Sequence, residues 1–144
     1  MLEKIVVIHC PVETVFAFYL DPTNRVLWDP HVMSGRFISP PPLQVGSLFS
    51  LVVRQEGVIT EIERTVTIYE QNRKFSYKFE AKRAYITNHH LFEAQDGQTV
   101  LRMWIEYQPK GVIKWFTKPF AYQQEQMLDE GLRKLKQVLE ERCL

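Results

Sequence analysis

The stretch KIVVIHCPVETVFAFYLDPTNRVLWDP (residues 4–30) changes its pattern several times over a short distance. Residues 4–10 form a short segment that is rich in β-branched side chains, and this composition predicts a strand. Pro11 suits the first position of a helix, where a missing N–H costs little. The apolar residues that follow recur at helical spacing, at Val12, Val15, Phe16 and Tyr19.

Two Asp-Pro pairs divide the rest of this stretch. Asp21-Pro22 ends the first helix, because the residue before a proline is pushed out of the α region. A second short helix is predicted over about residues 23–28, ending before Asp29-Pro30. The chain therefore begins with a strand and two short helices.

The middle of the chain is predicted to form an antiparallel sheet, since apolar and polar residues alternate with a period of two. The alternating segments are residues 47–55, 58–70, 74–82, 85–94 and 98–107. A short strand at about residues 36–39 precedes them, and the prolines at 40–42 mark a loop because proline cannot donate to a sheet. Asp96-Gly97 predicts a tight hairpin between the last two segments.

The end of the chain, residues 112–142, is predicted to be a long helix. Its apolar stripe is formed by Leu128, Leu132, Leu135 and Leu139. Pro119 is expected to kink or delimit it, with residues 112–118 as a separate turn or short helix. Residues 1–144 are thus predicted to be one α+β domain, a curved six- to seven-stranded antiparallel sheet wrapped around the long helix. A helix about 10 Å across cannot fill a strongly bent sheet, so a pocket of roughly 300–1,000 Å³ is expected.

Composition excludes some classes of protein. A net charge of +1 with interspersed charges argues against a nucleic-acid partner. No segment approaches the length of a membrane span, and the start of the chain does not resemble a signal peptide. Cys10 and Cys143 match no disulfide framework or metal spacing, so they are predicted to be reduced thiols in a cytoplasmic protein without metal or cofactor. The oligomeric state does not follow from the sequence.

Three motifs together resemble one superfamily. They are VVIHCPVETVFAFYLDPTNRVLWDP (residues 6–30), FEAQDGQTVLRMWIEY (residues 92–107) and LRKLKQVLEER (residues 132–142). They resemble the first strand and helix pair, the final hairpin and the helix end of START lipid-transfer domains, birch-pollen allergens and polyketide cyclase/dehydrases, the SRPBCC superfamily. The resemblance implies a helix-grip fold with a ligand cavity between sheet and long helix, and carries over no catalytic motif.

The inward faces of the predicted strands supply the candidate ligand-binding residues. With Trp28 from the second helix and two residues of the long helix, these are Trp28, Phe49, Leu51, Ile62, Arg64, Val66, Phe75, Tyr77, Phe79, His90, Phe92, Leu101, Met103, Ile105, Phe120 and Leu128. Trp28 is expected near the cavity mouth. Most of these side chains serve as ordinary core unless space remains among them.

Two polar residues stand out because burying a polar group costs free energy unless it is paired. Arg64 either anchors a carboxylate or phosphate of an apolar ligand or pairs with a nearby acid. His89 and His90 are adjacent on a strand and face opposite ways. By analogy with the family hairpin His90 is placed inward, as a general base, a ligand hydrogen-bonding group or a satisfied core histidine.

Three functions follow from these features. The first is a binding or carrier protein for a hydrophobic small molecule such as a lipid, polyketide or aromatic metabolite. The second is a cyclase or dehydratase-type enzyme that uses the same cavity, with His90, Tyr77 or Arg64 as its polar groups. The third is a protein-interaction module that docks a partner through Trp104 and the Trp115-Phe116 stretch.

Overall fold

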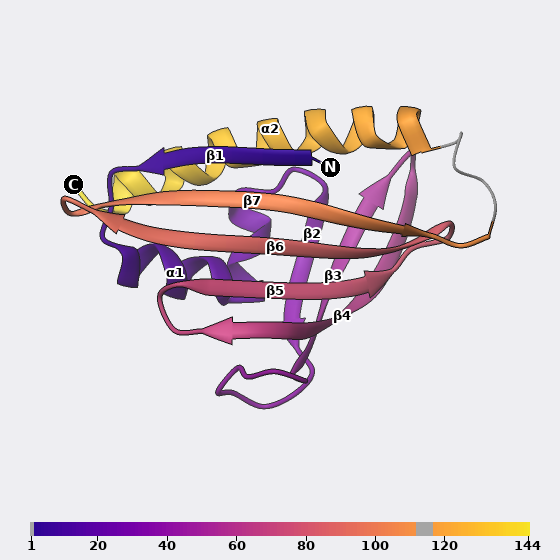
Figure 1. The fold of residues 1–144 in the computed structure, drawn as a ribbon, viewed down its shortest axis with the longest axis horizontal. Coiled ribbons are helices and arrows are strands. Elements are labelled where there is room, and N and C mark those ends of the chain that lie inside the picture. Colours follow the sequence, from indigo (N-terminus) through magenta and orange to yellow (C-terminus); the bar gives the residue numbers. More distant parts are fainter. Residues whose placement is uncertain (1, 112–116) are drawn as a thin grey trace.

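The structure is a computed structural model that describes residues 2–111 and 117–144, with side chains described for residues 3–111 and 125–144. The chain alternates between a few helices and a run of strands (Figure 1). In order these are β1 (Leu2–Ile8), α1 (Val12–Leu20), the 3₁₀ helix η1 (Pro22–Leu27), β2 (Val32–Phe37), β3 (Leu48–Gln55), β4 (Val58–Glu70), β5 (Lys74–Glu80), β6 (Ala84–Gln95), β7 (Gln98–Pro109) and α2 (Thr117–Arg142).

The strands form one seven-stranded antiparallel sheet in the order β1-β7-β6-β5-β4-β3-β2. The first strand therefore pairs with the last, which brings the start of the chain beside the hairpin of β6 and β7. That hairpin turns at Asp96 and Gly97, both with positive φ, as the Asp-Gly pair predicts. The curved sheet grips α2, while α1 and η1 close one end of the space between them (Figure 1).

Helix α2 is held to the sheet mainly by its second half. Leu132, Leu135 and Leu139 are at most 5% exposed, and each lies in the same core as Ile8 of β1. Burying one such leucine contributes about 2 kcal/mol. The helix begins at Thr117, so Pro119 lies in its first turn, where backbone N–H groups have no helical partners. Pro119 thus delimits the helix; residues 112–116 lie outside the described residues.

Lys4 of β1 forms ion pairs with the first half of α2. Lys4 Nζ lies 2.8 Å from Glu125 Oε1 and 3.0 Å from Asp129 Oδ1. The sheet provides these acids with a partner because β1 lies directly beside the helix (Figure 1). No helix within the described part of the chain has the length and apolar character needed to cross a membrane.

The prediction that the two cysteines are reduced thiols is wrong. Cys10 and Cys143 form a disulfide, with their Cα atoms 5.6 Å apart although 133 positions separate them in the sequence. Cys10 follows β1 and Cys143 follows α2, and the side-by-side packing of these elements brings the two together. The bond ties the end of α2 to the start of α1.

Two strands differ from their predicted form. In β4, where regular alternation would place Ile68 on the same face as Val66, the pairing with β5 shifts between these two residues. Ile68 is therefore 39% exposed, and Tyr69 packs on the core instead. A bulge of this kind reverses the faces beyond it. The second strand, β2, begins at Val32 rather than at residue 36 as predicted.

Gly35 lies in the middle of β2, where η1 crosses the strand. A Cβ at this position would lie 2.2 Å from the carbonyl oxygen of Pro22 and 2.7 Å from a methyl group of Leu51. We expect Gly35→Ala to lower the free energy of unfolding by about 3 kcal/mol, since overpacking costs 1–3 kcal/mol and backbone cannot yield easily. Urea unfolding beside the exposed neighbour Ser34→Ala measures this; equal stability of the two variants would contradict the close approach.

Candidate functional site

A cavity of about 80 Å³ lies between the sheet and α2. Strands β5, β6 and β7 form its floor, η1 and the residues after it form one wall, and α2 forms its cover. Its side chains mix apolar surface with a few polar groups, and the lining residues are Arg25, Trp28, Asp29, Tyr77, Asn88, Met103, Trp104, Ile105, Met127 and Leu128. The predicted location of a pocket under the long helix is therefore correct.

This cavity is smaller than the 300–1,000 Å³ expected from the bend of the sheet. Trp28 occupies part of this space: it is 2% exposed, buried under the helix rather than at a mouth as predicted, and stacks on Tyr19 with ring centroids 5.4 Å apart. Gly131 of α2 faces this indole, where a Cβ would lie 3.2 Å from the ring. Because glycine has no side chain, α2 can pack closely against the Trp28 ring at this position.

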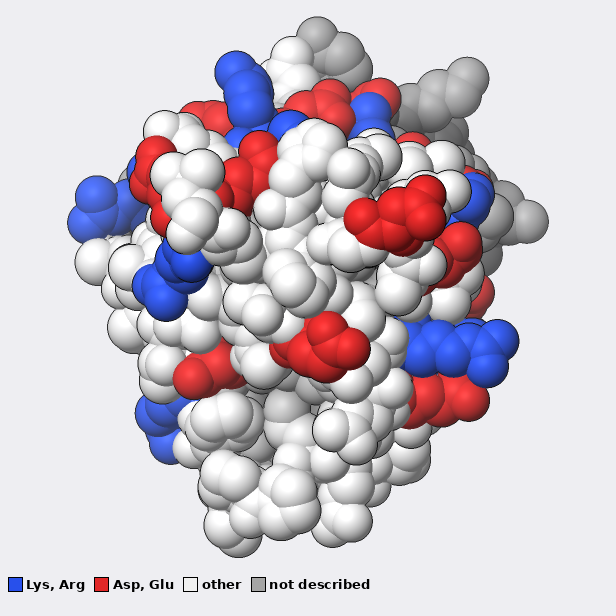
Figure 2. Space-filling view, turned by 90° about the vertical axis from the view of Figure 1, so that its left-hand side faces the viewer, with Lys and Arg blue, Asp and Glu red and all other residues white. Residues whose placement is uncertain are grey.

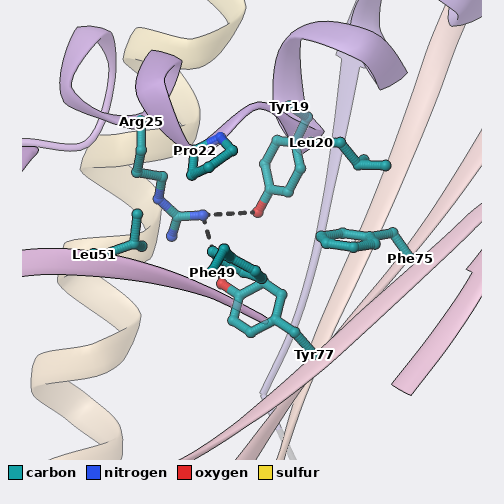
Figure 3. Close-up of a pocket in the computed structure, with 8 residues that line it drawn as sticks. All are labelled: Tyr19, Leu20, Pro22, Arg25, Phe49, Leu51, Phe75 and Tyr77. Atoms are coloured by element: carbon teal, nitrogen blue, oxygen red, sulfur yellow. Dashed lines mark hydrogen bonds between the residues drawn. The ribbon is translucent and has the colours of Figure 1, made fainter. Parts of the chain in front are cut away.

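Arg25 of η1 lies at the centre of the polar part of the site. Its Nε donates to Asp29 Oδ2 at 3.0 Å, one helical turn later, and its guanidinium stacks over the Trp28 ring at 4.3 Å. Nη1 points toward the hydroxyl groups of Tyr19 and Tyr77, at 3.4 and 3.5 Å (Figure 3). It also lines a second space of only about 10 Å³, enclosed by the aromatic and aliphatic side chains labelled in Figure 3.

Tyr77 of β5 lines both spaces, and its hydroxyl group receives several donors. Asn88 Nδ2 of β6 donates to it at 2.9 Å, in addition to Arg25. Burial alone would raise the pKa of Tyr77, but the positive charges of Arg25 and Arg64 and the hydrogen bond from Asn88 lower it overall. The environment of this phenol thus favours negative charge.

Arg64 of β4 faces inward, as predicted, and is 6% exposed. Its Nη1 donates to the carbonyl oxygen of Ile62 at 2.7 Å, and its guanidinium lies 4.6 Å from the ring centroid of Phe79. Among the described residues no carboxylate forms a salt bridge with Arg64, and its buried Nε has no acceptor. Burial lowers the pKa of Arg64 to about 10, so the group remains charged at neutral pH.

His90 faces inward, as the analogy with the family hairpin predicts, but both of its ring nitrogens are occupied. Nδ1 lies 2.8 Å from the carbonyl oxygen of Phe75, so this nitrogen carries the proton and donates it. Nε2 therefore accepts from the Tyr19 hydroxyl at 2.7 Å. Burial lowers the pKa of His90 to about 3, which leaves a neutral ring that joins α1 to the sheet.

The rings of His89 and Trp104 lie on the opposite, outer face of the sheet, although Trp104 also borders the cavity. Their rings stack with centroids 5.1 Å apart, His89 Nδ1 lies 2.7 Å from Ser76 Oγ, and Nε2 lies 3.1 Å from Glu106 Oε1. Trp104 is only partly exposed, because His89 covers one side of it. Residues 115–116, the other half of the suggested docking surface, lie outside the described residues.

The surface at the end of the molecule that contains the β6–β7 turn carries charges of both signs. Figure 2 shows Lys and Arg interspersed with Asp and Glu around this face, with uncharged surface in its middle and lower parts. Among the described residues drawn there, no large patch has a single sign.

The structure divides the predicted ligand-binding residues into three groups. Some line the spaces described above: Trp28, Phe49, Leu51, Phe75, Tyr77, Met103, Ile105 and Leu128. Others pack behind or beside them as core: Arg64, Val66, Phe79, His90, Phe92 and Leu101. Ile62 is half-buried and belongs to neither group. The side chain of Phe120 lies outside the described residues.

Sequence reasoning missed Arg25, Asp29 and Tyr19 and gave Asn88 no role. The i,i+4 spacing of Arg25 and Asp29 was visible, but it also fits an exposed ion pair. Only the packing of η1 against β2 and β3 brings Arg25 of this pair to Tyr77 of β5. Asn88 lies on the same face of β6 as His90, as the alternation along a strand requires.

Comparison with known proteins identifies the family to which this chain belongs. A family model described as polyketide cyclase / dehydrase and lipid transport matches residues 2–140. The chain therefore belongs to this family, whose members are ligand-binding or polyketide cyclase-type proteins. No curated protein sequence matches.

Solved structures show the same helix-grip fold. A START superfamily protein from Mycobacterium smegmatis has a TM-score of 0.70 and 16% identity, with 99% of this chain and 95% of that chain covered. Ara h 8.0201 has a TM-score of 0.70 and 10% identity, with 96% and 95% covered. The di-domain ARO/CYC StfQ of the steffimycin biosynthetic pathway has a TM-score of 0.75 and 11% identity, with 99% of this chain and 45% of that chain covered.

Proposed function

We propose that this protein binds or carries a hydrophobic small molecule in the cavity between the sheet and α2. The observation that carries the proposal is a cavity with apolar walls, among them Met103, Ile105 and Leu128, that also holds unsatisfied polar atoms. The indole N–H of Trp28 and the carbonyl oxygen of Asn88 have no hydrogen-bond partner among the described residues, although both are buried. Buried polar groups normally have partners, so a ligand group is a natural one.

A volume of about 80 Å³ suits one functional group of a ligand rather than a whole one. The rest of the ligand can bind only if side chains that line the cavity change conformation. Met103 and Met127 can do so, because unbranched thioether side chains rearrange easily. The covering part of α2 also has the weaker attachment: Leu128 is half-buried, whereas the fully buried leucines lie further along the helix. Entry beneath Met127 and Leu128 therefore disturbs the least packing.

The proposal predicts that an anilinonaphthalene dye binds the protein and that filling the cavity prevents this. Leu128→Trp places a large ring on the wall, and we expect it to weaken dye binding at least 10-fold, or about 1.4 kcal/mol. Lys134→Trp makes the same change at an exposed position of the same helix and should leave binding unchanged. Fluorescence titration gives both dissociation constants.

Native mass spectrometry of the freshly purified protein, beside its denatured mass, provides an independent check. A discrete extra mass that disappears on denaturation gives the molecular weight of the ligand. A bare mass combined with no uptake of the dye would exclude the binding function.

A second candidate is a cyclase or dehydratase-type enzyme acting in the same cavity. One observation favours it: the phenol of Tyr77 borders the cavity with a lowered pKa, next to two arginines. Such a group suits proton transfer to or from a carbonyl substrate. His90 is a poor candidate for the same role, because both of its nitrogens are engaged. Conversion of a bound compound to a product of different mass distinguishes the enzyme from a carrier.

A further inference from the structure

We propose that the ligand carries a carboxylate, bound beside Tyr77 by the guanidinium of Arg64. The inference rests on the proposed binding function and names the chemical class of its ligand, a hydrophobic carboxylic acid.

The first argument is the balance of charge around Tyr77, which lines the cavity and has Arg64 in the core behind it. Arg25 and Arg64 each contribute one positive charge near the Tyr77 hydroxyl, and Asp29 contributes one negative charge. Asp29 is already paired with Arg25 at 3.0 Å. One buried positive charge therefore has no counter-ion within the described residues. An uncompensated buried charge is costly, and a carboxylate from a ligand removes that cost.

The second argument is the excess of hydrogen-bond donors. The Tyr77 hydroxyl accepts from Asn88 at 2.9 Å and faces Arg25 at 3.5 Å, while Arg64 interacts with the same group. The buried Arg64 Nε and Trp28 Nε1 have no acceptors among the side chains and backbone that the structure describes. A carboxylate offers about four lone pairs and no proton, which is what a cluster of unsatisfied donors requires.

The aromatic surroundings indicate the rest of the ligand. Phe79 lies against the Arg64 guanidinium, and Trp28, Met103 and Ile105 form apolar walls beyond Tyr77. Cation–π contacts hold Arg64 in place without neutralising it, since the ring has no net charge. An acid with a flat or flexible apolar body fits these walls.

The experiment compares 2-naphthoic acid with 2-naphthamide, which has nearly the same shape and no charge. Calorimetric titration of the unaltered protein is expected to give at least 10-fold tighter binding of the acid. Arg64→Met should remove this preference and leave the affinity for the amide nearly unchanged. Arg54→Met, at an exposed position on the neighbouring strand β3, is the matched control and should keep the preference.

Stability in the absence of ligand provides a second readout. Arg64→Met should melt at the same or a higher temperature, because an apolar side chain replaces an unpaired buried charge. If that variant does not fold, Tyr77→Phe tests the same site, and it should reduce the preference for the acid several-fold by removing one hydrogen bond.

Each outcome separates the two proposals. Equal affinity for the acid and the amide in the unaltered protein overturns the carboxylate site but leaves the binding function intact. A preference that persists in Arg64→Met, or that Arg54→Met removes equally, shows that general surface charge attracts the acid and also overturns the site. Failure of both compounds and of the anilinonaphthalene dye to bind overturns the binding function itself.

Discussion

Replacing both Cys10 and Cys143 by serine is expected to lower the free energy of unfolding by about 5 kcal/mol. The disulfide closes a loop of 133 positions, nearly the whole chain, and a cross-link of that length removes a large share of the conformational entropy of the unfolded state. The bond also ties the end of α2 to the start of α1, so the helix that covers the cavity loses its distal anchor. Urea unfolding monitored by tryptophan fluorescence measures the change.

The reduced form of the unaltered protein provides the control for this prediction. Dithiothreitol should lower its stability to that of the double serine variant, and should leave the variant itself unaffected. Intact mass after alkylation under denaturing conditions establishes independently whether the two thiols are free. Identical unfolding curves with and without reductant, together with two alkylated thiols, would show that the cysteines do not pair.

Acidification is expected to destabilise the protein through His90. The pKa of this imidazole is about 3 in the folded state, whereas an unfolded histidine takes up its proton near 6.5. The unfolded state therefore binds more protons between these values, and the contribution of His90 to stability, fully present above pH 6.5, is lost as the pH falls toward 3. The loss amounts to about 1.4 kcal/mol per pH unit, or about 3 kcal/mol by pH 4.

His90→Gln isolates this effect from the carboxylates that also titrate in this range. Glutamine offers a donor for the Phe75 carbonyl and an acceptor for the Tyr19 hydroxyl, yet it does not ionise. The free energies of unfolding of the two proteins, measured from pH 7.5 to pH 4, should differ by a constant amount above pH 7. Below pH 6.5 the unaltered protein should lose stability faster, and parallel curves throughout would rule out a buried neutral His90.

Both predictions concern groups that determine the shape of the proposed binding site from a distance. The disulfide fixes the end of α2, and the His90–Tyr19 hydrogen bond fixes α1 against β5 and β6. Tyr19 in turn stacks on Trp28, which limits the cavity volume. Loss of either constraint should therefore change ligand affinity as well as stability, although neither group needs to touch the ligand.

The sequence by itself determined the parts of the fold that have local causes. The Asp-Gly turn and the leucine stripe of α2 each act through the geometry of a few neighbouring residues, and the structure confirms both. In β5 the predicted alternation of buried and exposed residues holds only in part, because Ser76 is buried between Phe75 and Tyr77. The inward placement of His90 follows from the same rule, because alternation along an unbroken strand fixes which face a side chain occupies.

Only the tertiary structure decided the features that depend on residues far apart in the chain. Cys10 meets Cys143 because β1 and α2 pack side by side, which no local pattern encodes. The bulge after Val66 depends on the register with β5 and turns Ile68 outward. The polar cluster around Tyr77 joins η1, β4, β5 and β6, and Trp28 is buried beside the cavity rather than at its mouth. Local periodicity determines which face of a strand or helix a side chain occupies. The packing of elements that are distant in the sequence determines which other residues that side chain contacts.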